Sequence, residues 1–141
     1  MKKLILLLLF FPLVFYAQSN VANKLLDSGI RKVFEEKFDQ ALIDFNLAKE
    51  KDKEGSIKDK IYYERAQLKR RKFKDFKGAL GDYNLSLKYN PDLVKTYMYR
   101  GLMYERNFRN FIAAEKDYRK SVEIDPECGA CWMQLGYLTE R

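Results

Sequence analysis

The chain repeats itself over most of its length. Residues 61–91 align without a gap with residues 96–126, at a constant offset of 35 residues. Chance gives about two identities in such an alignment. Ten positions are identical: Tyr62/Tyr97, Arg65/Arg100, Arg71/Arg106, Phe73/Phe108, Phe76/Phe111, Ala79/Ala114, Asp82/Asp117, Tyr83/Tyr118, Ser86/Ser121 and Pro91/Pro126. A unit of this size cannot bury its apolar side chains alone, so the units must stack to form one continuous core.

Two further copies flank these units. The earlier copy lies 38 residues before the second unit and matches it at Phe38, Ala41, Asp44, Phe45 and Ala48. Its extra length falls in residues 51–56, which are polar and contain a glycine, so we expect a longer loop there. The later copy begins after Pro126 with Trp132, Leu135 and Gly136. The units are therefore placed at about 21–56, 57–91, 92–126 and 127–141.

Within each unit the apolar spacing is that of α-helices. Ala79, Tyr83 and Ser86 recur at i, i+4 and i+7, which places a small, a large and a small side chain on one helix face. Pro91 and Pro126 disfavour helical conformation at the residue before them, so a helix ends at each. The pattern predicts seven helices, at about 21–35, 38–51, 57–72, 76–89, 92–107, 111–124 and 129–139.

The units resemble the tetratricopeptide repeat (TPR). The pattern of that family has an aromatic residue, a small residue four positions later, an alanine, a second aromatic, another small residue and a closing proline. The third unit supplies Tyr97, Gly101, Ala114, Tyr118, Ser121 and Pro126. The second supplies Tyr62, Ala66, Ala79, Tyr83, Ser86 and Pro91, and the first Gly29, Ala41, Phe45 and Ala48. The resemblance implies an all-α fold over residues 18–141, a right-handed superhelix of about three and a half stacked antiparallel helix pairs.

This sequence departs from the family pattern at a few positions. Arg65 and Arg100 stand where the family usually has leucine, and the later units are 35 residues long. The unpaired last helix is expected to cap the third unit. A sequence that continues into further repeats is the alternative explanation of its abrupt end.

The first segment has the layout of a secretory signal peptide. Lys2 and Lys3 precede an apolar stretch at residues 4–16, and Ala17 fits the position before a cleavage site. The stretch is shorter than the roughly 20 residues that span a bilayer, so no transmembrane span is expected once residues 1–17 are removed. An uncleaved N-terminal anchor is the alternative. We expect an exported protein, periplasmic or secreted, whose formal charge falls from +7 to +5 when the two lysines are lost.

The composition argues against catalysis and against a resident metal or cofactor. Histidine, the commonest general base near neutral pH and the commonest metal ligand, is absent. No glycine-rich phosphate loop, dinucleotide fingerprint or nucleophile-elbow motif is present. We therefore expect a protein that is not an enzyme and holds no cofactor or metal.

The resemblance implies that the first helix of each pair lines a concave groove that holds a protein or peptide segment. Tyrosine and arginine are favoured at protein interfaces, and methionine adapts to varied shapes. The expected groove residues are Lys60, Tyr63, Glu64, Gln67, Arg70, Arg71, Lys95, Met98, Tyr99, Leu102, Glu105, Arg106, Met133, Gln134 and Tyr137. This mixture suits a peptide with apolar and acidic positions. The alternative for any one of them is packing within the superhelix or simple solvation.

One ligand of the family is excluded at this stage. Family members that clamp the C-terminal carboxylate of a chaperone use lysines and asparagines at fixed groove positions. Lys95 fits one of these positions, but Glu64, Tyr99, Leu26 and Ile30 occupy others. We therefore do not expect that carboxylate clamp here.

A basic run at residues 69–77 offers a second interpretation. Its lysines and arginines alternate with Phe73 and Phe76, a composition that can bind nucleic acid or another anionic polymer. The run also covers a helix end, where cations interact favourably with the helix dipole. Export makes nucleic acid an unnatural partner, so the structural role is preferred.

A Cys-x-x-Cys pair, Cys128 and Cys131, is the only cysteine chemistry in the chain. Zinc needs two more ligands, which a chain without histidine or further cysteines does not readily supply. In an oxidising compartment the pair can close a local disulfide at the start of the last helix. Ordinary packed thiols and a redox-active accessory role remain the alternatives.

Overall fold

A computed structural model describes residues 20–140 of the chain. In this part the chain is all-α and contains no strand. An N-terminal helix runs through residues 20–34. It is followed by α2 (Phe38–Lys51), α3 (Lys58–Leu68), α4 (Phe76–Tyr89), α5 (Val94–Arg106), α6 (Phe111–Ile124) and α7 (Gly129–Thr139). The seven predicted helices are thus confirmed, whereas the predicted signal peptide lies outside the described residues.

One predicted helix differs at its end. The spacing predicts a single helix over residues 57–72, but the α-helical part of α3 ends at Leu68 and continues as a π-helical turn at Lys69–Phe73. Lys74 then adopts a left-handed backbone with φ of 56°. A change from α to π hydrogen bonding is invisible to hydrophobic periodicity, which depends only on which side chains are apolar.

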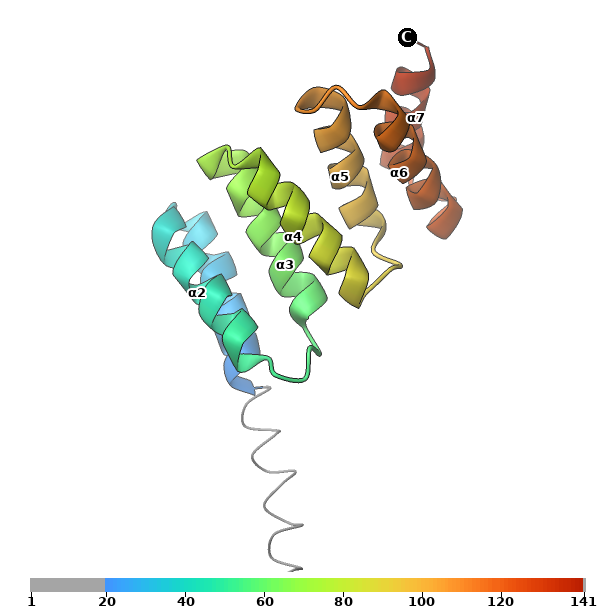
Figure 1. Ribbon diagram of the computed structural model, residues 1–141. Coiled ribbons are helices and arrows are strands. Elements are labelled where there is room, and N and C mark those ends of the chain that lie inside the picture. Colours follow the sequence, from blue (N-terminus) through green and yellow to red (C-terminus); the bar gives the residue numbers. More distant parts are fainter. Residues whose placement is uncertain (1–19, 141) are drawn as a thin grey trace, which may run out of the picture.

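The helices form antiparallel pairs that stack in a row (Figure 1). The N-terminal helix pairs with α2, α3 with α4, and α5 with α6, while α7 packs against α6 at the C-terminal end. This is the all-α solenoid that the repeat predicts. Within residues 20–140 no helix is both long enough and apolar enough to cross a membrane.

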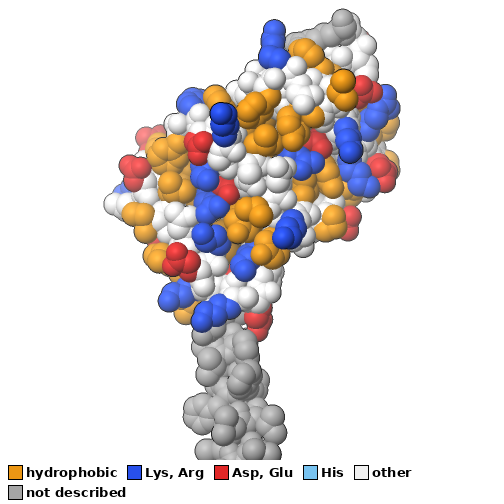
Figure 2. Space-filling model, viewed as in Figure 1, with side chains coloured by type: hydrophobic (Ala, Val, Ile, Leu, Met, Phe, Trp, Pro, Cys, Tyr) orange, Lys and Arg blue, Asp and Glu red, His pale blue; other side chains and the backbone are white. Residues whose placement is uncertain are grey.

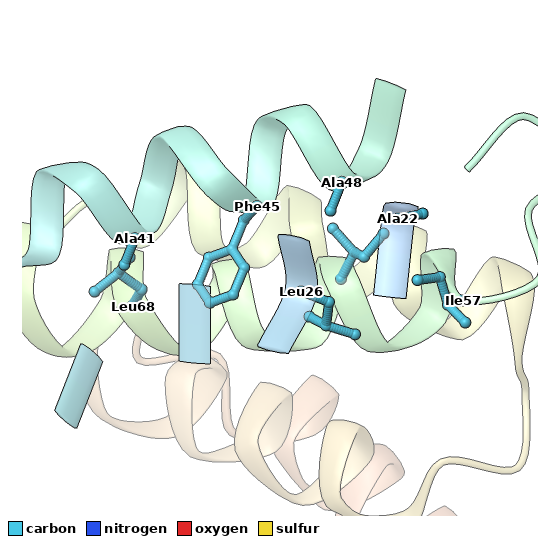
Figure 3. Close-up of a cluster of buried hydrophobic side chains, with 8 residues drawn as sticks. Ala22, Leu26, Ala41, Phe45, Ala48, Ile57 and Leu68 are labelled. Atoms are coloured by element: carbon cyan, nitrogen blue, oxygen red, sulfur yellow. The ribbon is translucent and has the colours of Figure 1, made fainter. Parts of the chain in front are cut away.

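An aromatic side chain on the second helix of each pair forms the centre of each unit. Phe45, Tyr83 and Tyr118 are completely buried. Phe45 points from α2 into a cluster that includes Leu26 of the N-terminal helix and Leu68 of α3 (Figure 3). The small residues on either side of each aromatic in the sequence let the first helix approach closely. The periodic pattern of small and large residues thus determines how the pairs pack.

The turns within the three pairs share one backbone geometry. Glu36, Lys74 and Arg109 all have positive φ, between 54° and 59°. The next helix is capped in the second and third units, because Asp75 accepts a hydrogen bond from Gly78 N at 2.9 Å and Asn110 from Ala113 N at 3.1 Å. A left-handed residue followed by an Asp or Asn cap ends one helix and starts the next within a few residues.

The longer loop predicted at residues 51–56 is held by a buried carboxylate. Asp52 is 2% exposed. One oxygen accepts hydrogen bonds from Ser56 N and Ser56 Oγ, and the other accepts one from Ile57 N at 3.0 Å. Ile57 immediately precedes α3, so this network fixes the start of α3 in the absence of the proline that ends the later units.

The two arginines that replace the family leucine form matching ion pairs. Arg65 binds Asp82 through Nε at 2.8 Å and Nη2 at 2.5 Å, and its Nη1 donates to Asn46 of the preceding unit. Arg100 makes the same bonds to Asp117 and to Asn84. The repeated arginines therefore tie each second helix to its own first helix and to the previous unit. The departure from leucine is a coordinated one, because Asp and Asn accompany each Arg.

Candidate functional site

Two adjoining hollows open on the first helices of the stacked pairs. One has a volume of about 380 Å³ and an apolar floor that includes Leu26, Ile30 and Val94. The other, of about 370 Å³, includes Val33, Phe38 and Leu68. Tyr63 and Glu64 of α3 line both hollows. The two hollows therefore form one continuous groove across the N-terminal helix, α3 and α5.

An aromatic cluster lies at the middle of this groove. The ring of Tyr63 is 6.4 Å from that of Tyr83 and 6.3 Å from that of Tyr99, measured between centroids. The guanidinium of Arg70 lies over Tyr99 at 5.1 Å, and Arg70 Nη2 donates to Gln67 Oε1 at 2.8 Å. Tilted rings at these distances attract each other, and so do a cation and a ring face. The floor of the groove is therefore preorganised.

Burial changes the ionisation of two groove residues. Burial raises the pKa of the Glu64 carboxyl above its usual value, and the positive charge of Lys95 opposes this only partly. Burial also raises the pKa of Tyr63 to about 12, so its hydroxyl stays neutral and able to donate a hydrogen bond at neutral pH. Such a tyrosine and such a carboxylate can together donate to and accept from an extended backbone.

The charges around the groove are mixed. Asp27, Glu64 and Asp92 line the first hollow together with Lys60 and Lys95. In the second hollow, Arg71 and Lys72 face the same space as Glu36 and Glu64. Neither hollow has a lining of a single sign, so a purely acidic or purely basic ligand is not complementary to both.

Comparisons with solved structures identify the fold. The first TPR of Spaghetti (RPAP3), bound to an HSP90 peptide, superposes with a TM-score of 0.76 at 23% identity, covering 86% of this chain and 93% of that one. The Arabidopsis OM64 TPR domain superposes with a TM-score of 0.77 at 17% identity, covering 87% and 98%. The chain has the tetratricopeptide-repeat fold.

A bacterial TPR protein is also similar. A tetratricopeptide repeat protein from Parabacteroides merdae superposes with a TM-score of 0.72 at 27% identity. The match covers 84% of this chain and 44% of that protein. No protein-family model matches the sequence, and no curated protein matches it either. At these identities the structural comparisons establish the TPR fold and leave the function to be argued from the groove.

The predicted groove residues do not all line the two hollows. Seven of them line the hollows: Lys60, Tyr63, Glu64, Gln67, Arg71, Lys95 and Tyr99. Arg70 contacts this group through Tyr99. Arg106 is exposed on the last turn of α5. These residues come from α3 and α5, as the alignment of the TPR units predicts.

Three predicted residues of α5 are used inside the fold instead. Met98 and Leu102 are half-buried and pack against the C-terminal cluster around Tyr118. Glu105 is only 6% exposed and accepts a hydrogen bond from Tyr118 Oη at 2.9 Å. Because this carboxylate serves the core, Glu105 has little surface for a partner. Sequence alignment gives a residue's position on a helix but not the depth to which a neighbour covers it.

The predicted residues of α7 lie away from the two hollows. Met133 and Tyr137 are 49% and 60% exposed, and Gln134 is half-buried. None of the three is among the residues that line either described hollow. They extend the exposed surface of the first helices toward the C-terminal end.

Several groove residues were missed by the sequence analysis because the first unit matches the TPR pattern only weakly. The N-terminal helix supplies four of them to the first hollow: Asn23, Leu26, Asp27 and Ile30. The connection between α4 and α5 and the start of α5 add Asp92, Leu93, Val94 and Thr96. The second hollow adds Val33, Phe34, Glu36, Phe38, Leu68 and Lys72. Gly29 belongs to the TPR pattern of the first unit, and Leu26 and Ile30 stand at groove positions of the family, so the sequence does contain a signal that the N-terminal helix lines the groove.

Three of the six cations in the basic run at residues 69–77 make contacts within the protein. Lys69 Nζ lies 3.0 Å from Asp82 Oδ2, and Lys72 Nζ lies 4.4 Å from the centre of the Phe38 ring. Arg70 lies over Tyr99. On the face shown in Figure 2, lysine and arginine side chains are interspersed with acidic and hydrophobic ones. A broad single-sign surface of the kind that binds polyanions is absent from that face.

The cysteine pair is joined in the structure. Cys128 and Cys131 form a disulfide with an S–S distance of 2.03 Å. Cys128 is the N-cap of α7, and its Sγ accepts a hydrogen bond from Cys131 N at 3.2 Å. Cys131 is completely buried in the C-terminal cluster. Within the described residues no group of three or more Cys, Asp or Glu side chains is arranged to hold a metal ion.

Proposed function

We propose that this chain is an exported protein-interaction module that holds an extended segment of another protein in its concave groove. The proposal rests on the continuous groove, in which the two hollows share Tyr63 and Glu64. Both residues belong to α3, the first helix of the second unit. Two similar TPR domains bind peptides: the first TPR of Spaghetti with an HSP90 peptide, and the second TPR of human RPAP3 with an HSP70 peptide. The proposed module has no catalytic role.

The groove favours a segment with an apolar and an acidic position. The apolar floor formed by Leu26, Ile30 and Val94 suits an aliphatic side chain. Arg71 and Lys72 border the other hollow and can pair with a carboxylate of the ligand. Glu64 lies between the two and can accept a hydrogen bond from a backbone N–H of an extended segment.

This chemistry differs from that of the HSP90 and HSP70 peptides, SRMEEVD and SGPTIEEVD, which end in acidic residues. The half-buried carboxylate of Glu64 in the middle of the groove repels a ligand with consecutive acidic residues. The proposed partner segment therefore alternates apolar, neutral and single acidic positions, and the two chaperone peptides serve as negative controls.

The direct experiment is crosslinking in cells followed by mass spectrometry, which identifies the partner and the segment that it contributes. Calorimetry then measures the affinity of the protein for that segment. Arg71→Glu should weaken binding at least about tenfold, because it removes a pairing cation and adds a repelling charge. Lys116→Glu, an equal charge change on α6, is the matched control and should leave binding unchanged. Equal effects of both substitutions would exclude the groove as the binding site of the segment.

Export is proposed from residues 1–17 alone and needs its own test. Fractionation of cells that express the full chain, with N-terminal sequencing of the recovered protein, should find a product that begins at Gln18 in the periplasm or medium. Recovery of a membrane-bound protein that retains residues 1–17 would support the uncleaved anchor instead.

The redox alternative is tested separately. The structure gives it one favourable feature, because Cys128 is only half-buried at the first turn of α7. Against it, Cys131 is fully buried and both sulfurs are already bonded to each other. An assay of disulfide exchange with a protein disulfide should find no activity above that of the Cys128→Ala/Cys131→Ala variant. The anionic-polymer alternative predicts steep loss of binding with salt, which titration with a sulfated polysaccharide would detect.

A further inference from the structure

The turns within the three helix pairs follow one another along one edge of the solenoid (Figure 1). Antiparallel pairing places the connections between the pairs at the opposite edge. The turns of the second and third units are neighbours, because Phe76 of one and Phe108 of the other pack against the same buried cluster around Tyr83. Residues 69–77 and 106–112 therefore form one adjoining surface.

These two segments carry the whole net charge of the chain. Residues 69–77 contain six cations and one acid, and residues 106–112 contain two cations and no acid. The chain has 27 cations and 20 acids, so the 19 cations and 19 acids outside the two segments cancel. We call the surface formed by the two segments the basic edge. Charge of one sign gathered in one place is complementary to an anionic partner.

Most cations of the basic edge are not neutralised within the protein. Five of them are exposed and form no ion pair with an acid among the described residues: Arg71, Lys74, Lys77, Arg106 and Arg109. The single acid of the edge is Asp75, whose carboxylate accepts the capping hydrogen bond from Gly78 N. The five cations are therefore available to a ligand.

Exposed apolar side chains lie among these cations. Ile112 is 86% exposed, Phe111 is 41% exposed and Phe73 is 38% exposed. An isoleucine with so little of its surface covered adds almost nothing to the hydrophobic stabilisation of the fold. The basic edge thus presents cations and apolar groups on one surface.

We propose that the basic edge binds the surface of a membrane that contains anionic lipids. The cations lie among the lipid phosphates, and Phe73, Phe111 and Ile112 enter the boundary between headgroups and acyl chains. Binding at a membrane surface strengthens with the apolar area that is buried and with the attraction to anionic lipid. The basic edge supplies both contributions. Such binding is peripheral and requires no helix that crosses the bilayer.

The exposed isoleucine distinguishes a membrane from a soluble polyanion. Nucleic acids and sulfated polysaccharides pair with cations, and nucleic-acid bases also stack on phenylalanine. Neither polymer offers an aliphatic side chain an apolar environment. A lipid surface does, and transfer of an aliphatic side chain out of water is favourable. Ile112 is therefore the residue that favours a lipid surface.

The turn of the first unit is not part of the basic edge. Residues 31–39 contain three cations and three acids. Lys37 Nζ donates to Glu35 Oε2 at 2.8 Å, and Arg31 Nε lies 3.8 Å from Glu35 Oε1. The acids of this turn disfavour contact with anionic lipid, although Phe34 is exposed. The first hollow of the groove contains no residue of the basic edge, so a membrane and a protein segment have separate binding surfaces.

Cosedimentation with lipid vesicles tests the proposal. The protein, in the form in which it is recovered from cells, is titrated with vesicles of equal parts phosphatidylglycerol and phosphatidylcholine. Vesicles of phosphatidylcholine alone are the reference. Binding to the anionic vesicles should be at least about tenfold stronger than to the neutral ones and should weaken as the salt concentration rises. All variants are compared in the same form, so any contribution of residues 1–17 is common to them.

Two double variants test the role of the charge. Lys77→Glu/Arg109→Glu should weaken binding to the anionic vesicles at least about tenfold, because it reverses two charges of the basic edge. Lys53→Glu/Lys88→Glu is the matched control, since it makes the same charge change at exposed positions toward the opposite edge. The control should weaken binding by no more than about twofold, because salt screens distant charges. Circular dichroism verifies that both variants are folded.

Two single variants test the role of the apolar side chains. Ile112→Ser should weaken binding to the anionic vesicles at least about threefold. Ile43→Ser, at an exposed isoleucine in the middle of α2, should leave it unchanged. Insertion is observed directly in an Ile112→Trp/Trp132→Phe variant, whose fluorescence brominated lipid in the anionic vesicles should quench. This readout is local to the basic edge and does not depend on residues 1–17.

Three outcomes would overturn the proposal. The first is equal binding to neutral and anionic vesicles, with no quenching of the tryptophan at position 112. The second is equal weakening by the two double variants, which would mean that only the total charge matters. The third is vesicle binding that Ile112→Ser leaves unchanged, together with binding of dextran sulfate that Lys77→Glu/Arg109→Glu abolishes. That result would assign the basic edge to a soluble polyanion.

Discussion

The guanidinium of Arg100 and the carboxylate of Asp117 are joined by two parallel hydrogen bonds, each 2.7 Å long. Arg65 and Asp82 repeat the arrangement one unit earlier. Two-pronged pairs of this kind are strong and directional, so they fix the rotation of one helix against the other as well as their separation. The rigidity of the first helices matters for function because they carry the groove residues.

Breaking one pair should destabilise the protein more than removing the pair entirely. Asp117→Ala leaves the largely buried Arg100 without its carboxylate and should cost about 3 kcal/mol of unfolding free energy. Arg100→Leu/Asp117→Ala should recover most of that loss, since Leu135 occupies the equivalent position in α7 without an ion pair. Urea denaturation followed by circular dichroism measures both. A double variant less stable than Asp117→Ala would contradict the argument.

Two glycines should respond in opposite ways to alanine. Gly101→Ala places a methyl group against the Tyr118 ring, which is held by Glu105, and should cost about 1–2 kcal/mol. Gly81→Ala meets no neighbour within 4 Å and should gain about 0.5–1 kcal/mol from higher helix propensity. Thermal unfolding of the two variants compares them directly, and loss of stability in both would show that the contact with the Tyr118 ring is not the cause.

The ionised carboxylate of Glu64 should lower the free energy of unfolding at neutral pH. Its pKa is raised in the folded protein, so its contribution to stability is present below the unfolded pKa and is lost as the pH rises through the folded pKa. Glu64→Gln should therefore raise the urea midpoint at pH 7, and this gain should disappear near pH 3. The same substitution should weaken binding of the partner segment, as expected for a residue kept for function.

A matched control for this experiment is Glu35→Gln. Glu35 is exposed, and its hydrogen bond from Lys37 lowers its pKa, which is the opposite direction. This variant should give no gain at pH 7. A gain of equal size in both variants would mean that general repulsion among the carboxylates, and not burial of Glu64, is responsible.

Reduction of the disulfide should have a modest effect. The loop from Cys128 to Cys131 is short, so the chain-entropy model gives at most about 2 kcal/mol. Dithiothreitol should lower the unfolding midpoint slightly and leave the Cys128→Ala/Cys131→Ala variant unaffected. The fluorescence of Trp132, which lies in α7, reports whether this helix unfolds during the experiment. Complete unfolding on reduction would assign the disulfide a larger role than this loop allows.

The helices and their pairing could be predicted from the sequence because both depend on local spacing. The run of Ala79, Tyr83 and Ser86 identifies a helix face, and its recurrence 35 residues later identifies the stacked unit. The helices and their pairing follow from periodicity. The groove positions on α3 follow from the resemblance to the TPR family, and two of them, Tyr63 and Glu64, line both hollows.

Contacts between different helices could not be predicted from periodicity. Nothing in the sequence places Glu105 beneath Tyr118, or brings Leu26 and Ile30 to the same hollow as Val94. Nor does the sequence show that a Cβ added to Gly101 would come within 2.6 Å of the Tyr118 ring.

By itself, therefore, the sequence determined the all-helical class, the number of units and the alternation of small and aromatic residues that lets the helices approach. Only the tertiary structure decided which side chains line the groove and which arginines are paired. The physical reason is that helix faces are set by neighbours three and four residues apart, whereas burial is set by whichever distant segment packs against them.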